Sequence, residues 1–140
     1  MRRSLSMMLL LLEKAEQGTL SAYIQAPLPK QKELENFIER KRQTLIDHVL
    51  LLKEAGYLSQ LSISFTDHGL EYHGDFVRLT MKGHDLLALM RSNPLRQRME
   101  EILKSTGLPL ISDSLDLIQH EAIDELIRER TREHKAKLGL

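Results

Sequence analysis

The sequence predicts an α+β fold, and three features near its middle support that prediction. A stretch with apolar residues three and four positions apart ends at Gly56, a residue type that often closes helices. Apolar and polar residues then alternate over residues 57–65 and 70–79, on either side of a Thr-Asp-His-Gly turn, which predicts an antiparallel hairpin. Thr80 follows as the cap of a helix that begins at Met81. This order predicts a winged helix-turn-helix core in which the hairpin is a two-stranded wing.

The beginning of the chain is expected to hold one helix and one short strand. Ser4 or Ser6 can cap a helix that ends at Gly18. Residues 19–26 alternate in part and include aromatic and β-branched side chains, so a strand is expected there. The two prolines that follow would interrupt regular structure.

Residues 30–55 are helical by pattern, but the sequence leaves open whether they form one helix or two. A helix-turn-helix needs a break, usually marked by glycine or serine, and residues 39–43 contain neither. Helix propensity alone favours one continuous helix. The family resemblance described below favours a turn within residues 39–43, which makes residues 44–55 the recognition helix.

The winged-helix core is placed at residues 1–92, and residues 93–140 are expected to add two C-terminal helices. One helix covers residues 95–105. The other is capped by Asp113 or Ser114 and carries a broad apolar stripe. This extension either packs on the core or forms a homodimer interface.

Length and charge narrow the class of protein. The chain has 140 residues, the size of one ordinary domain, and its 20 basic and 20 acidic residues give a net charge of zero. Balanced charge argues against a protein that coats nucleic acid nonspecifically. The chain has no cysteine, which excludes disulfides and cysteine-based zinc sites. The apolar run over residues 7–12 is too short for a signal peptide or a membrane span, so a cytoplasmic protein without a membrane partner is expected.

Motifs for catalysis are not found in the sequence. A phosphate-binding glycine loop, a nucleophile elbow and a pair of carboxylates at catalytic spacing are all missing. The six histidines do not show the spacing of metal ligands. We therefore expect a protein that is not an enzyme, with no catalytic residue, cofactor, metal or small-molecule substrate.

The candidate DNA-binding residues lie at the start of the expected recognition helix and on the wing. The run Arg40-Lys41-Arg42 would sit where the N–H groups and dipole of a helix N-terminus attract phosphates. Its ordinary interpretation is a solvated surface. His48 is open to two interpretations, a base contact and a buried structural residue. The full candidate set is Arg40, Lys41, Arg42, Gln43, Thr44, His48, His68, His73 and Arg78.

Three blocks of the sequence resemble a bacterial family of winged-helix proteins. They span His48 to Leu58, Val77 to Leu87 with its Arg-Leu-Thr-x-x-Gly-His core, and Lys137 to Leu140. The family resembled is the domain-of-unknown-function family numbered twenty-five thirteen, met in prophage and mobile-element neighbourhoods. The resemblance covers nearly the whole chain and implies a winged helix without an established activity. The chain departs from the family in a charged, proline-flanked stretch at residues 27–43 and in a longer hairpin.

Two hypotheses for function follow from these observations. The first is a DNA-binding module that regulates transcription in a prophage or mobile element, with duplex DNA as its partner. The second is a non-catalytic protein–protein interaction module, which the zero net charge and the acidic wing residues Asp67, Glu71 and Asp75 support. Fold alone does not decide between them. A homodimer through the C-terminal helices fits the first, since symmetric operators match two-fold proteins.

Overall fold

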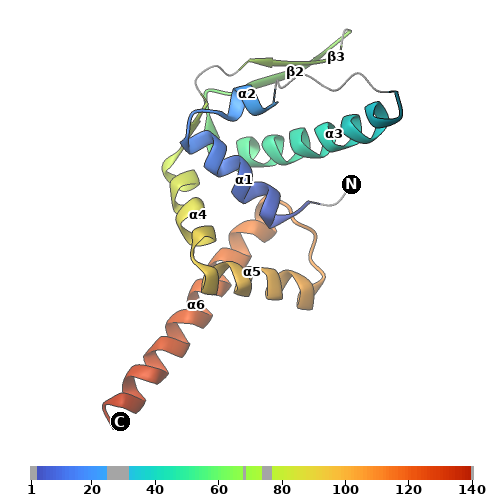
Figure 1. Ribbon diagram of the computed structural model, residues 1–140. Helices are drawn as coiled ribbons and strands as arrows, with labels where there is room; N and C mark the ends of the chain where they lie inside the picture. Colours follow the sequence, from blue (N-terminus) through green and yellow to red (C-terminus); the bar gives the residue numbers. More distant parts are fainter. Residues whose placement is uncertain (1–2, 25–31, 68, 74–76, 140) are drawn as a thin grey trace. The chain divides into compact units, whose positions relative to one another are not determined.

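The computed structural model describes residues 3–24, 32–67, 69–73 and 77–139, with the side chains of residues 32–42, 62–66 and 69–73 left undescribed. These residues form a mostly helical α+β arrangement of six helices and four short strands (Figure 1). The chain divides into two compact units, Met1–Leu87 and Ala88–Leu140. The division falls inside a helix, five residues before the expected boundary at residue 92, and each unit is described separately below.

The first helix, α1 (Leu5–Glu16), begins and ends where the sequence predicted. The Ser4 hydroxyl accepts a hydrogen bond from the Met7 N–H at 3.1 Å, which caps the helix. Gly18 closes it at φ 75°, with its N–H and that of Thr19 bonded to earlier carbonyls. Its buried face packs on α3 and β4 and consists of Leu5, Met8, Leu11, Leu12 and Ala15.

The predicted strand at residues 19–26 is wrong, because Leu20–Ile24 forms the short helix α2. The alternation of Leu20, Ala22 and Ile24 suggested a strand. Leu20 and Ile24 are also four residues apart, however, and so share one face of a helix. Both are buried while Ala22 is exposed, and α2 packs against α1 and α3. Residues 25 and 26 lie outside the described residues.

The expected turn within residues 39–43 is also wrong. A single helix, α3 (Lys32–Glu54), runs through this segment for 23 residues. The charged residues of the segment are good helix formers and contain no glycine or proline, so local propensity prevails. Gly56 ends the helix at φ 86°. Its N–H bonds to the Lys53 carbonyl and the Tyr57 N–H to the Leu52 carbonyl, which is the predicted left-handed C-cap.

The predicted hairpin is present as two successive antiparallel ladders. At its base, β1 (Leu58–Ser59) pairs with β4 (Arg78–Leu79). Further out, β2 (Ser62–Thr66) pairs with β3 (Gly69–His73), from Ser62 opposite His73 to Thr66 opposite Gly69. Gln60, at φ 61°, lies between the ladders. Residues 74–76 lie outside the described residues, so a bulge near Gly74 and Asp75, which the sequence suggests within the returning strand, stays a prediction.

Helix α4 (Met81–Arg91) follows the hairpin directly and carries a buried face of Leu86, Leu87 and Met90. In the first unit, Leu86 and Leu87 of this face belong to a core that also contains buried residues from every earlier helix and from the base of the hairpin. From the hairpin region it includes Tyr57, Leu58, Leu61, Val77 and Leu79, from α3 Val49, Leu51 and Leu52, and from the residue after α3 Ala55.

The second unit is built on the packing of α5 (Asn93–Thr106) against α6 (Ser112–Lys137). Gly107 ends α5 at φ 65°. The predicted cap of α6 is displaced, since the helix begins at Ser112 and Ile111 occupies the cap position. Ser114 still stabilises this end, because its hydroxyl accepts from the Ile111 N–H at 2.9 Å. The buried residues of the two helices are Met99, Ser114, Leu115, Ile118 and Ala122.

Candidate functional site

The nine candidate DNA-binding residues are distributed over α3 and the hairpin. Arg40, Lys41 and Arg42 lie within the backbone of α3, where their side chains fall outside the described residues. They are not at a helix N-terminus, so the expected attraction of phosphates by free N–H groups does not apply to them. Gln43 is exposed on the same helix, and Thr44 is half-buried.

Three candidate residues, His68, His73 and Arg78, belong to the hairpin segment of the chain. Arg78 is exposed on β4. His73 ends β3 opposite Ser62, with its side chain outside the described residues, and His68 lies wholly outside them. The structure therefore offers Gln43 and Arg78 as candidate contacts whose side chains are exposed.

His48 is removed from the candidate set. Its side chain is fully buried, and both ring nitrogens are engaged within the first unit. Nε2 accepts a hydrogen bond from the Ser4 N–H at 2.8 Å, and Nδ1 lies 2.6 Å from the Thr44 carbonyl oxygen. Only the neutral ring with its proton on Nδ1 makes both bonds at once. The structural interpretation of His48 is therefore the correct one, since the ring fastens the start of α1 to the middle of α3.

An ion pair lies beside this histidine. Arg3 donates to both oxygens of the Asp47 carboxylate, from Nε at 2.8 Å and from a terminal nitrogen at 3.2 Å. These hydrogen bonds lower the pKa of the Asp47 carboxyl and raise the pKa of Arg3. This pair has no local signature in the sequence, because the two residues are 44 positions apart. Arg3 is therefore tied to α3.

A second cluster joins the end of α3 to the start of α4. Thr80 is the predicted cap, since its hydroxyl oxygen accepts from the Gly83 N–H at 3.1 Å. The same hydroxyl donates to the Gly56 carbonyl at 2.5 Å, and the Thr80 N–H donates to the Tyr57 carbonyl at 3.1 Å. Gly83 is buried against this carbonyl, where a Cβ would overlap the oxygen. We call Gly56, Tyr57, Thr80 and Gly83 the joint.

Lys82 adds a cation to the joint that the sequence did not reveal. Its Nζ donates to the Ala55 carbonyl at 2.9 Å and lies 4.7 Å from the centroid of the Tyr57 ring. The first contact places a positive charge at the C-terminal end of α3, where the helix dipole favours it, and the second is a cation–π contact. Lys82 therefore has a structural role.

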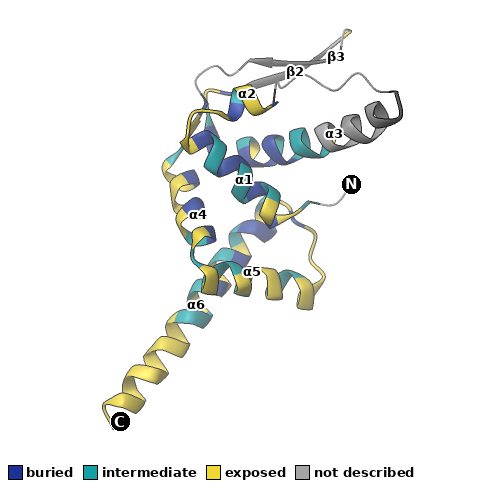
Figure 2. Ribbon diagram, in the orientation of Figure 1, coloured by how far each residue is buried: buried dark blue, intermediate teal, exposed yellow. Residues whose placement is uncertain are grey.

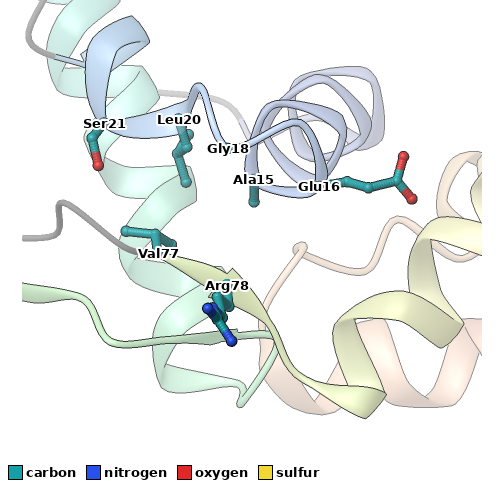
Figure 3. Close-up of a pocket in the computed structure, with 7 residues that line it drawn as sticks. All are labelled: Ala15, Glu16, Gly18, Leu20, Ser21, Val77 and Arg78. Carbon is teal, nitrogen blue, oxygen red and sulfur yellow. The ribbon is translucent and has the colours of Figure 1, made fainter.

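A pocket of about 360 Å³ opens where α1 and α2 meet β4 (Figure 3). Leu20 and Val77 supply apolar surface, and Glu16, Ser21 and Arg78 supply polar groups. Figure 3 shows the Glu16 carboxylate directed away from the Arg78 guanidinium, so the two charges do not converge on one ligand position. This geometry does not assemble an acid, a base and a nucleophile within reach of one substrate atom.

The described part of the chain shows no metal-binding cluster and no membrane-spanning helix. No group of three His, Asp or Glu residues there is placed to hold a metal ion. None of the described helices is both long and apolar enough to cross a membrane.

Comparisons with known proteins leave the site to be interpreted from its own geometry. No protein-family model matches this chain, and no curated protein or solved structure matches it either. The class that the described residues define is an α+β protein with a helical C-terminal unit. The family resemblance of the sequence blocks at residues 48–58 and 77–87 remains a prediction.

Proposed function

We propose that the first unit is a winged-helix module that binds duplex DNA. The observation that carries the proposal is the chain order: α1, α2 and α3 pack together, an antiparallel hairpin follows, and its two ends pair beside the start of α4. A winged helix has the same succession of three helices and a wing. In this interpretation α2 and α3 form the helix-turn-helix, α3 is the recognition helix and β2–β3 is the wing.

The proposed contact surface is the solvent side of α3 together with the base of the wing. Gln43 is exposed on α3 and Arg78 on β4, and glutamine and arginine both hydrogen-bond to base edges or phosphates. The basic run at residues 40–42 immediately precedes Gln43. Because α3 continues through this run, the proposed phosphate contacts are made by long cationic side chains partway along a helix.

The test is a fluorescence-anisotropy titration of the full chain with sheared genomic duplex DNA. Binding should weaken between about 50 and 200 mM salt, because each neutralised phosphate releases counterions. Replacing Arg40 and Arg42 with glutamine keeps helix propensity and removes two charges. If each cation contacts one phosphate, the slope of log K against log salt should fall by about 2.

The matched control removes two charges elsewhere, through Arg91→Gln on α4 and Lys104→Gln on α5. This control changes the net charge equally, so a specific site predicts little change in its salt slope. If both double variants lose affinity alike, binding is diffuse and the assignment of the site to α3 fails. If the unaltered chain does not bind DNA at the lower salt, the DNA proposal itself fails. The interaction-module hypothesis would then take its place.

A further inference from the structure

Helix α6 carries a row of exposed residues on the face away from α5. Positions along this row recur every three or four residues, the spacing of a helix–helix seam. Leu117, Ile127 and Leu138 are its large apolar members, and their relative exposures are 64%, 57% and 59%. We call the row the α6 seam, and its members are Leu117, His120, Asp124, Ile127, Thr131, His134 and Leu138, all of them exposed.

The opposite face of α6 already has a partner inside the second unit. Its buried residues Leu115, Ile118 and Ala122 belong to the side that packs on α5. Further along this side, Arg98 of α5 pairs with Glu125 and Glu129. At 100° per residue, these positions lie roughly half a turn from the α6 seam. The seam is therefore a second, separate face of the helix.

The second half of α6 has no buried residue. Every residue from Ile127 to Gly139 is exposed, as the yellow end of this helix in Figure 2 shows. A helix without a buried stripe gains little stability from its own chain, since helical stability in proteins comes mainly from packing of an apolar face. Ile127 and Leu138 leave apolar surface on this exposed half.

Charge along α6 is divided between its two halves. Residues 112–126 hold five acidic residues (Asp113, Asp116, Glu121, Asp124 and Glu125) and no lysine or arginine. Residues 127–138 hold five basic residues (Arg128, Arg130, Arg132, Lys135 and Lys137) against Glu129 and Glu133, a net charge of 5 − 2 = +3. The helix is therefore complementary to a second copy of itself only when the two run in opposite directions.

We propose that a second copy of this chain docks along the α6 seam as an antiparallel two-fold pair centred on Ile127. This register follows from the seam, because a two-fold axis at Ile127 places His120 opposite His134 of the second copy. The same axis brings Leu117 opposite Lys137, one residue from Leu138. It also sets the acidic half of each helix against the basic half of the other. A parallel pair would instead oppose five acidic residues to the same five. The proposal does not depend on DNA binding, since it uses only the second unit.

Sedimentation of the full chain over a hundredfold range of concentration tests the pairing. We expect a reversible dimer that weakens as salt is raised, because screening removes the attraction between the two halves. Ile127→Asp places two carboxylates at the two-fold axis and should raise the dissociation constant at least about tenfold. The matched control is Ala136→Asp, which adds the same charge at an exposed position away from the seam. A monomer at every concentration, or equal effects of the two variants, overturns the proposal.

Single cysteines test the direction, because the natural chain has none. In an antiparallel pair, Leu117→Cys and Leu138→Cys chains should form a disulfide when mixed and oxidised, and neither should crosslink efficiently alone. Efficient crosslinking of Leu117→Cys with itself would indicate a parallel pair and overturn the register. Both positions are exposed, so neither change removes core packing, and circular dichroism verifies that each variant keeps its helix content.

Discussion

Gly83 gives the sharpest test of how the first unit is held together. It is a glycine inside α4, so ordinary helix propensity predicts that alanine at this position stabilises the protein by about 0.5–1 kcal/mol. The structure predicts the opposite. A Cβ on Gly83 would overlap the Tyr57 carbonyl oxygen and lie 3.1 Å from the carbonyl carbon, and both of these are backbone atoms.

The magnitude follows from what must move. To admit the methyl group, the start of α4 has to shift away from Tyr57, and three hydrogen bonds of the joint span that gap or end on Gly83. They are Thr80 N–H to Tyr57, the Thr80 hydroxyl to Gly56, and Gly83 N–H to Thr80. At about 0.5–1.5 kcal/mol each, their loss costs about 1.5–4.5 kcal/mol. Subtracting the propensity gain of about 1 kcal/mol leaves a net loss of roughly 2 kcal/mol.

Thermal unfolding followed by circular dichroism measures the effect. A loss of about 2 kcal/mol should lower the melting temperature by roughly 4–8 °C in a chain of this size. Ala88→Gly is the control, because it is an exposed position in the same helix and should cost about 1 kcal/mol by propensity alone. If Gly83→Ala raises the melting temperature while Ala88→Gly lowers it, only propensity acts on α4 and the argument from the Tyr57 carbonyl is refuted.

Three further predictions concern the joint and the ion pair. Thr80→Val should destabilise the protein by about 0.5–2 kcal/mol and Thr80→Ser by much less, because serine keeps the capping hydroxyl. Urea unfolding measures both free energies of unfolding, and equal values for the two variants would contradict the cap. Gly56→Val should destabilise the protein by at least about 1 kcal/mol and Gly56→Asn by less, because Gly56 has φ 86° and asparagine tolerates positive φ better than valine. A Cβ at this position meets no neighbour within 4 Å, so the cost is one of backbone conformation alone, and equal melting temperatures of the two variants would contradict this origin. Arg3→Met should destabilise the protein at neutral pH. Because Arg3 lowers the pKa of Asp47, this stability is present above the ordinary carboxyl value of 3.8 and is lost as the pH falls through the lower folded value; a pH-independent difference would count against the pair.

Signals carried by single residues were predicted well from the sequence. Ser4, Gly18, Gly56 and Thr80 all cap helices as expected, because a cap depends on one side chain or on one backbone angle within a few residues. The hairpin was found for a similar reason, since its turn residues and its alternation lie within one short stretch. Local chemistry is sufficient to specify such features.

Features that depend on partners far along the chain were missed. The strand predicted over residues 19–26 is a helix because Leu20 and Ile24 are buried against α1 and α3, and alternation does not identify that environment. The Arg3–Asp47 pair and the double hydrogen bonding of His48 link α1 to α3 and have no local signature. The turn expected within residues 39–43 came from the family resemblance, against helix propensity, and the observed helix follows propensity.

The joint also explains why the block at residues 78–84 is informative about fold and uninformative about function. Thr80 must offer a hydroxyl to both Gly56 and Gly83, and Gly83 must lack a side chain to lie against the Tyr57 carbonyl. These requirements fix the position of α4 against the base of the hairpin through contacts within the first unit. Similarity in this block therefore reports how the elements are joined, whatever the protein binds. Evidence for a partner has to come from the solvent side of α3 and from the α6 seam, where substitutions alter binding without touching the joint.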